Sequence, residues 1–186
     1  CPHGAEAYDE VVRAYAEVAA GADSIIAEVG AWSNPLSPVE EERKEALEKC
    51  KAGLDLADRI GANCCVNIAG SRGEKWDGPS PYDLTAETFD MIVDTVREII
   101  DSVKPKRTFY TLETMPWMYP DSVESYLHLL EAIDRRAFGV HFDPVNLVCS
   151  PQRYFNNGDL ISNFIEKLGP KIKSVHAKDI LLHDTL

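Results

Sequence analysis

The sequence predicts an α/β protein in which β-strands and α-helices alternate and the strands run parallel. Two observations carry this prediction. Short apolar runs, such as CCVNIA at residues 64–69, alternate with longer segments whose apolar residues recur at helical spacing. The last three strand-like runs also lie roughly 30 residues apart, which is the length of one strand plus one crossover helix. Chains with this alternation form a parallel sheet covered by helices.

The N-terminal third contains a leading helix, a strand and a long helix. Residues 5–20 have the apolar spacing of an amphipathic helix. Residues 24–29 (SIIAEV) form a short apolar strand. The segment Ser37-Pro-Val-Glu40 is typical of a capping box with proline at the first helical position, and it opens a helix that ends at Ile60.

The central third continues the alternation after the strand 64–69. Residues 85–103 form a helix with apolar residues at helical spacing, and residues 108–113 (TFYTLE) form the next strand. We expect Asp121 and Glu124 to cap the helix that follows, residues 122–133, because acidic side chains accept hydrogen bonds from the first amide groups of a helix.

The C-terminal third supplies the last two strands, residues 138–143 (FGVHFD) and residues 172–178, with a helix around residues 160–168 between them. A doubly wound sheet usually carries a glycine-rich phosphate loop, and the only candidate, AGSRG at residues 69–73, does not match G-x-G-x-x-G. A (β/α)₈ TIM barrel needs about 250 residues. The chain is therefore predicted to be an incomplete TIM barrel of about five βα units.

Composition narrows the possible functions. The 186 residues are 45% hydrophobic, which suits a single domain over residues 1–186. The net charge of −12 argues against binding to nucleic acid, which needs a basic surface. No apolar run approaches the roughly 20 residues that span a bilayer, and no signal peptide opens the chain. The five cysteines lack C-x-x-C spacing. We therefore expect a cytoplasmic protein with reduced thiols and no membrane partner.

Three of the predicted strands end in or near side chains that bind metal ions. Glu113 and Asp143 close two of them, and His176 lies within the third, at nearly even steps along the chain. Because the C-terminal ends of barrel strands meet at one rim, and that rim carries the active site, we expect these three side chains to form one.

The segments around these residues resemble the xylose-isomerase-like TIM-barrel superfamily, whose members include sugar isomerases and epimerases, inosose dehydratases and endonuclease IV. The matching motifs are FYTLE, VHFDPVN and VHAKD, and weaker likeness extends to IAEVG and ADRIGA. The resemblance implies strands 3–7 of eight, with Glu113, Asp143 and His176 as metal ligands on strands 5, 6 and 7. Strands 1–2 would precede Cys1, and strand 8, with a glutamate as fourth ligand, would follow Leu186.

The resemblance also implies a chemistry. Two carboxylates and an imidazole suit Mn²⁺, the expected ion, with Mg²⁺, Co²⁺ or Zn²⁺ as alternatives. Such an ion polarises a carbonyl, which makes the proton on the neighbouring carbon more acidic. Glu113 would be both a ligand and the general base. Lys178, on the same strand face as His176, would stabilise an enediolate oxygen.

The chain departs from the ketose epimerases at three positions. Asn146 stands where they carry the histidine of a D-x-x-H motif, Tyr119 where they carry a glutamate, and Leu182 where they carry an arginine. These differences argue against ketohexose 3-epimerisation in its familiar form. Endonuclease IV is disfavoured by the acidic charge and by the missing histidines on earlier strands.

The residues expected at the substrate are Asn146, His141, Asn34, Arg72 and Trp117. Asn146 can hydrogen-bond a hydroxyl. His141 either reaches the pocket or lies in the barrel core. Trp117, like Trp32, either acts as a platform for a sugar or packs within its loop.

The leading hypothesis is a divalent-metal-dependent isomerase or epimerase that acts on a small sugar or polyol. A monomer and a homo-oligomer both stay open. A metal-dependent lyase, similar to inosose dehydratase or to C-glycoside-cleaving enzymes, is the alternative, because the same base can eliminate a β-leaving group. A metal-free binding barrel is the third hypothesis.

Overall fold

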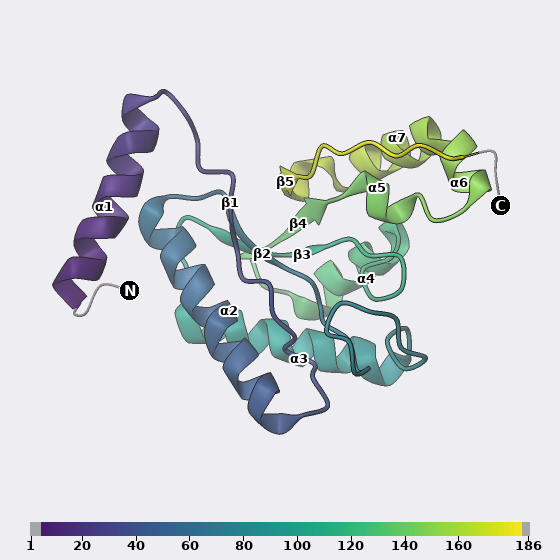
Figure 1. Ribbon diagram of the computed structural model, residues 1–186, viewed down its shortest axis with the longest axis horizontal. Coiled ribbons are helices and arrows are strands. Elements are labelled where there is room, and N and C mark those ends of the chain that lie inside the picture. Colours follow the sequence, from purple (N-terminus) through teal and green to yellow (C-terminus); the bar gives the residue numbers. More distant parts are fainter. Residues whose placement is uncertain (1–4, 184–186) are drawn as a thin grey trace.

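A computed structural model describes residues 5–183, and its centre is one sheet of five parallel strands (Figure 1). The strands are β1 (Glu28–Gly30), β2 (Cys64–Asn67), β3 (Phe109–Glu113), β4 (Phe138–Phe142) and β5 (Ile172–Val175). Each strand pairs in parallel with the one before it in the chain, so the order is β1-β2-β3-β4-β5. A doubly wound sheet would reverse this order at one point. The curled sheet confirms the predicted incomplete TIM barrel.

Helices connect the strands along one face of the sheet, as crossover connections require. The connecting helices are α2 (Glu40–Ile60), α3 (Ala86–Val103), α4 (Val123–Ile133), α5 (Pro144–Leu147), α6 (Pro151–Phe155), α7 (Asn157–Leu168) and the 3₁₀ helix η1 (Gly169–Lys171), whereas α1 (Ala5–Gly21) precedes β1. In Figure 1, α1 lies at the β1 end of the sheet, and it contacts α2. In the part of the chain that is described, no helix is both long and apolar enough to cross a bilayer.

The predicted helix caps were wrong in two places. Helix α2 begins at Glu40, after an N-cap residue, Val39, that makes no side-chain cap bond. The hydroxyl of Ser37 instead accepts from the Val39 amide and donates to Glu42. Helix α4 is capped by Ser122, in a capping box with Ser125 rather than by the predicted acidic residues.

The predicted first strand was also too long. Only Glu28–Gly30 pairs with β2, and Ile25, which precedes it, is 78% exposed. Within residues 5–183, β1 is an edge strand with a partner on one side alone. The last strand likewise ends at Val175, although the amide of His176 still donates to Phe142 O at 3.0 Å.

The two faces of the sheet differ in chemistry because strand side chains alternate. Residues on the outer face pack against the helices in one apolar core, among them Cys65, Tyr110, Leu112, Val140 and Phe142. The alternate residues on the concave face include buried or part-buried polar groups, among them Glu28, Thr111, Glu113, His141 and Ser174. The apolar core therefore stabilises the sheet through its outer face, whereas the polar side chains gather on its concave face.

Candidate metal centre

Three strand ends bring the predicted metal ligands together. Glu113 is the last residue of β3, Asp143 directly follows β4, and His176 directly follows β5. Nδ1 of His176 lies 2.9 Å from Oε1 of Glu113 and 3.3 Å from Oδ2 of Asp143. The two carboxyl groups are buried and the imidazole is partly buried.

Neighbouring side chains hold the two carboxyl groups in place. Asn146 donates from its side-chain Nδ2 to Oε1 of Glu113 at 3.2 Å. Its backbone amide donates to Oδ1 of Asp143, the residue that caps α5. Lys178 forms an ion pair with Asp143 and lies 3.7 Å from Oε1 of Glu113. The Thr114 hydroxyl accepts from the Asp143 amide at 3.0 Å. The two predicted residues Asn146 and Lys178 are thus in contact with the predicted ligands.

A tyrosine from the helix layer fixes the backbone beneath the site. The buried hydroxyl of Tyr126, on α4, donates to Leu112 O at 2.6 Å and accepts from the His141 amide at 3.1 Å. Leu112 precedes Glu113 in β3, and Glu113 is in register with His141 of β4. One side chain therefore links the two strands that carry these residues.

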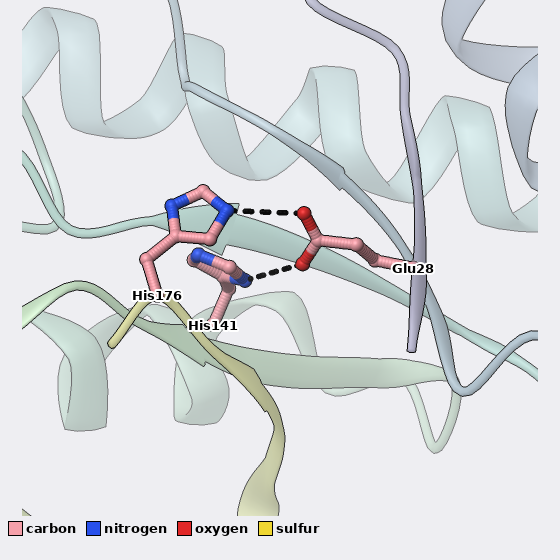
Figure 2. A group of neighbouring side chains, drawn as sticks. All are labelled: Glu28, His141 and His176. Atoms are coloured by element: carbon pink, nitrogen blue, oxygen red, sulfur yellow. Dashed lines mark hydrogen bonds and ion pairs between the residues drawn. The ribbon is translucent and has the colours of Figure 1, made fainter. Parts of the chain in front are cut away.

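Glu28 of β1 also reaches the site, and we did not predict it. Figure 2 shows its two carboxylate oxygens each facing one imidazole ring. Oε1 lies 3.0 Å from Nε2 of His176, and Oε2 lies 3.3 Å from Nδ1 of His141. The only sequence signal was a carboxylate inside an otherwise apolar strand. His141 itself is fully buried, with its Nδ1 2.6 Å from the hydroxyl of Ser174.

The adjacent carboxyl groups differ in proton affinity. Burial raises the pKa of Glu113, Asp143 adds to this and His176 opposes it, and the result is a pKa of about 7. Burial also raises the pKa of Asp143, but hydrogen bonding with Glu113 and with Lys178 outweighs burial, so this pKa lies below its ordinary value. Without a cation, Glu113 rather than Asp143 is therefore the carboxyl group that takes up a proton as the pH falls through about 7.

The two imidazoles are shifted in opposite directions. Burial lowers the pKa of His176, but hydrogen bonds to Glu28 and Glu113 outweigh burial and leave it above its ordinary value. Burial lowers the pKa of His141 to about 4, helped by the charge of His176, so His141 is neutral at physiological pH.

The geometry and chemistry of these residues fit a divalent cation. One ligand atom from each of Glu113, Asp143 and His176 lies within 4.8 Å of the others, and the group Glu28, His141 and His176 meets the same criterion. Oxygen and imidazole ligands suit Mn²⁺, Mg²⁺, Co²⁺ and Zn²⁺. A cation would also replace the proton that Glu113 holds. His176 belongs to both groups, so the two share one side chain.

Two of the other predicted substrate residues have hydrogen-bond partners within the loops. The side-chain amide of Asn34 donates to Ser71 O at 2.8 Å and accepts from the Ser71 amide at 3.0 Å. Arg72 pairs with Glu87 at 2.7 Å and lies over the ring of Tyr82. The substrate roles of Asn34 and Arg72 stay predictions.

The two tryptophans lie in different surroundings. Trp117 donates from its indole nitrogen to Asp77 O at 2.9 Å and is 38% exposed. Trp32, in the loop after β1, lies with its ring centroid 6.2 Å from that of His176 and is 37% exposed. Trp32 is therefore the tryptophan whose ring lies against a predicted metal ligand.

The sequence profile of the family described as "Xylose isomerase-like TIM barrel" matches residues 2–185. No curated protein sequence matches the chain significantly.

Solved structures with the same fold include a dehydratase and two epimerase-type proteins. The probable 3-DHS dehydratase AsbF of Bacillus anthracis, involved in petrobactin synthesis, has a TM-score of 0.70 at 20% identity, over 96% of this chain and 59% of that chain. D-psicose 3-epimerase from Clostridium cellulolyticum H10 has 0.69 at 16%, over 90% and 57%. A D-tagatose 3-epimerase-like protein has 0.67 at 23%, over 95% and 65%. The chain thus spans between 57% and 65% of these proteins, and the likeness shows a shared fold.

Proposed function

The chain belongs to the xylose isomerase-like TIM barrel family, and from that premise we propose that it is a divalent-metal-dependent isomerase or epimerase acting on a small sugar or polyol. The observation that carries the proposal is the convergence of Glu113, Asp143 and His176 at three strand ends. This rim is where barrel enzymes place their catalytic residues. Mn²⁺ is the proposed ion.

The residues of the chain have separate roles in this proposal. When bound, the ion supplies a Lewis acid that polarises the substrate carbonyl. Glu113 takes the proton from the neighbouring carbon, because its buried carboxylate ends β3 at the rim, beside the proposed ion. Asn146 orients that carboxylate through Oε1. The ammonium group of Lys178, which is about half exposed, stabilises negative charge on the substrate oxygen.

Trp32 is the proposed platform for the substrate. Its indole is part-exposed beside His176, so a sugar bound at the cation would lie within its reach. The apolar faces of a sugar ring pack well on an indole.

The proposal is tested first by metal binding and then by proton exchange. Titration with Mn²⁺, followed by the electron paramagnetic resonance of the free ion, should show one ion per chain. Incubation with a panel of aldoses, ketoses and ketopolyols in D₂O should place deuterium on the carbon next to the carbonyl of at least one of them, as read by NMR. Glu113→Gln should bind Mn²⁺ more weakly and lose deuterium exchange, whereas the exposed Glu131→Gln on α4 should keep both properties.

A lyase is the second candidate, and the residues Asn146, Tyr119 and Leu182 favour it, because they replace the groups that ketose epimerases use. The same base and the same polarised carbonyl would then expel a leaving group. Loss of water from 3-DHS or from an inosose, without deuterium in recovered substrate, would replace the isomerase proposal by this one. A protein that binds no divalent ion, and whose sugar affinity is unchanged in Glu113→Gln, would instead be a metal-free binding barrel.

A further inference from the structure

His176 presents its two ring nitrogens to different partners. Nδ1 faces the carboxyl groups of Glu113 and Asp143, at 2.9 and 3.3 Å. Nε2 points to the opposite side and lies 3.0 Å from Oε1 of Glu28. The carboxylate that meets Nε2 therefore comes from β1, whereas the other two come from β3 and from the end of β4.

A neutral imidazole carries one proton, and this limits how His176 can act. If Nδ1 is to offer its lone pair to a cation, the proton must be on Nε2 and needs an acceptor. Glu28 lies at hydrogen-bonding distance from Nε2 and, as a carboxylate, is a strong acceptor. Both groups are partly buried, with side-chain exposures of 25% for His176 and 23% for Glu28, so water is a poorer substitute.

Glu28 is itself held in position by His141. Oε2 of Glu28 lies 3.3 Å from Nδ1 of His141, which is fully buried and also lies 2.6 Å from the hydroxyl of Ser174. The His141 ring packs edge-on against that of His176, with centroids 4.2 Å apart (Figure 2). His141 therefore restricts both the carboxylate and the ring that the carboxylate contacts.

We propose that Glu28 is a positioning residue that fixes the His176 tautomer in which Nε2 is protonated and Nδ1 is free to bind the cation. His141 anchors Glu28 in this arrangement. The inference rests on the proposed metal-dependent function and deepens it. It also assigns the group Glu28, His141 and His176 to ligand orientation rather than to a second ion. A second ion on Nε2 would require His176 to lose both ring protons.

The first test is Mn²⁺ affinity in Glu28 variants, followed by the resonance of the free ion. Removing a carboxylate that orients a metal-bound histidine weakens metal binding by about 10–100-fold, and we expect this for Glu28→Ala. Glu28→Gln keeps an oxygen that can accept from Nε2 and should lose less. The matched control is Glu131→Ala, an exposed glutamate on α4, which should bind as the wild type does. Circular dichroism verifies that each variant is folded.

The second test reads the tautomer directly and does not depend on metal loading. Long-range ¹H–¹⁵N NMR of the metal-free protein, at a pH where His176 is neutral, should show that the tautomer with the proton on Nε2 is populated in the wild type. In Glu28→Ala the remaining carboxyl groups, Glu113 and Asp143, face Nδ1, so the proton should move to Nδ1. A residue that only supported the fold would not change the tautomer.

The outcomes separate the two proposals. A wild-type protein with the Nε2 proton that binds no Mn²⁺ overturns the proposed function and supports the tautomer assignment. Glu28→Ala with wild-type affinity, or with the proton still on Nε2, overturns the role of Glu28. Two Mn²⁺ ions per wild-type chain and one in Glu28→Ala also overturn it, because Glu28 would then be a ligand.

Discussion

The affinity of the site for Mn²⁺ should depend strongly on pH, because the cation must replace protons. In the metal-free protein, Glu113 has a pKa of about 7 through burial and the neighbouring Asp143. A protonated carboxyl group does not bind a metal ion, so binding releases this proton. The pKa of His176 is also raised, because its hydrogen bonds to Glu28 and Glu113 outweigh the effect of burial. The protonated form of His176 must therefore also lose its Nδ1 proton before it binds the ion.

The magnitude follows from the titration of Glu113. At pH 6 about one tenth of a group with a pKa of 7 is ionised, and at pH 8 nearly all of it is, so affinity should rise about tenfold over this interval. This factor corresponds to about 1.4 kcal/mol. The proton that His176 loses makes the Mn²⁺ affinity depend more steeply on pH. Affinity should therefore fall as pH decreases through 7.

The assay is a Mn²⁺ titration at several pH values, combined with calorimetry in two buffers of different ionisation enthalpy, which counts the protons released. Glu131→Gln, the exposed control, should reproduce the wild-type profile, whereas Glu113→Gln should bind more weakly and release fewer protons. An affinity that changes less than about threefold between pH 6 and pH 8 would refute the assignment of a shared proton to the buried carboxyl pair.

Three further predictions concern the support of the fold and the site. Tyr126→Phe removes the hydroxyl that bridges β3 and β4, and urea unfolding should show a loss of about 1–3 kcal/mol, while the exposed Tyr15→Phe should change stability by less than about 0.5 kcal/mol. Asp58 accepts from three successive backbone amides before β3 at 2.6–3.1 Å, which outweighs burial and lowers its pKa, so Asp58→Ala should cost about 1–3 kcal/mol at neutral pH. A lowered pKa in the folded state contributes full stability only above the pKa of the unfolded state, so the cost of Asp58→Ala should persist above pH ~4 and shrink as pH falls through the lowered pKa. An equal cost at pH 7 and at strongly acid pH would contradict this prediction. The exposed Asp94→Ala is the control. Lys178→Gln removes a positive charge beside Asp143, so Mn²⁺ should bind at least as tightly as in the wild type while deuterium exchange falls; weaker Mn²⁺ binding would argue that the ammonium group supports the ligands.

The sheet could be predicted because its signals are local. Strands buried against helices read as apolar runs, as at residues 64–69, and the distance between runs specifies crossover connections. The short helices α5 and α6 escaped prediction, since four or five residues contain too few turns to show a helical period. Their available signals were Pro144 and Pro151, each at a first helical position.

The residues of the candidate site likewise differ in how well the sequence predicts them. Glu113, Asp143 and His176 lie at strand ends, and parallel strand ends meet at one edge whatever the detailed curvature. Glu28 is different, because its contact with His176 crosses the concave face and depends on how strongly the sheet curls. No local pattern encodes that distance. Side chains in loops, such as Arg72, are also poorly predicted, since they pair with whichever residues the loops bring near.

The contact between Glu28 and His176 joins the first strand of the sheet to the last. These strands are not neighbours, so the contact acts as a chord across the arc, and any change in curvature must lengthen or shorten it. A ligand that binds the native arrangement stabilises it by mass action. Slowing of amide hydrogen exchange on metal binding should therefore appear at β1 as well as near β5, although β1 supplies none of the proposed ligands. The ion would then stabilise the curvature of the sheet, in addition to its role in the reaction at the strand ends.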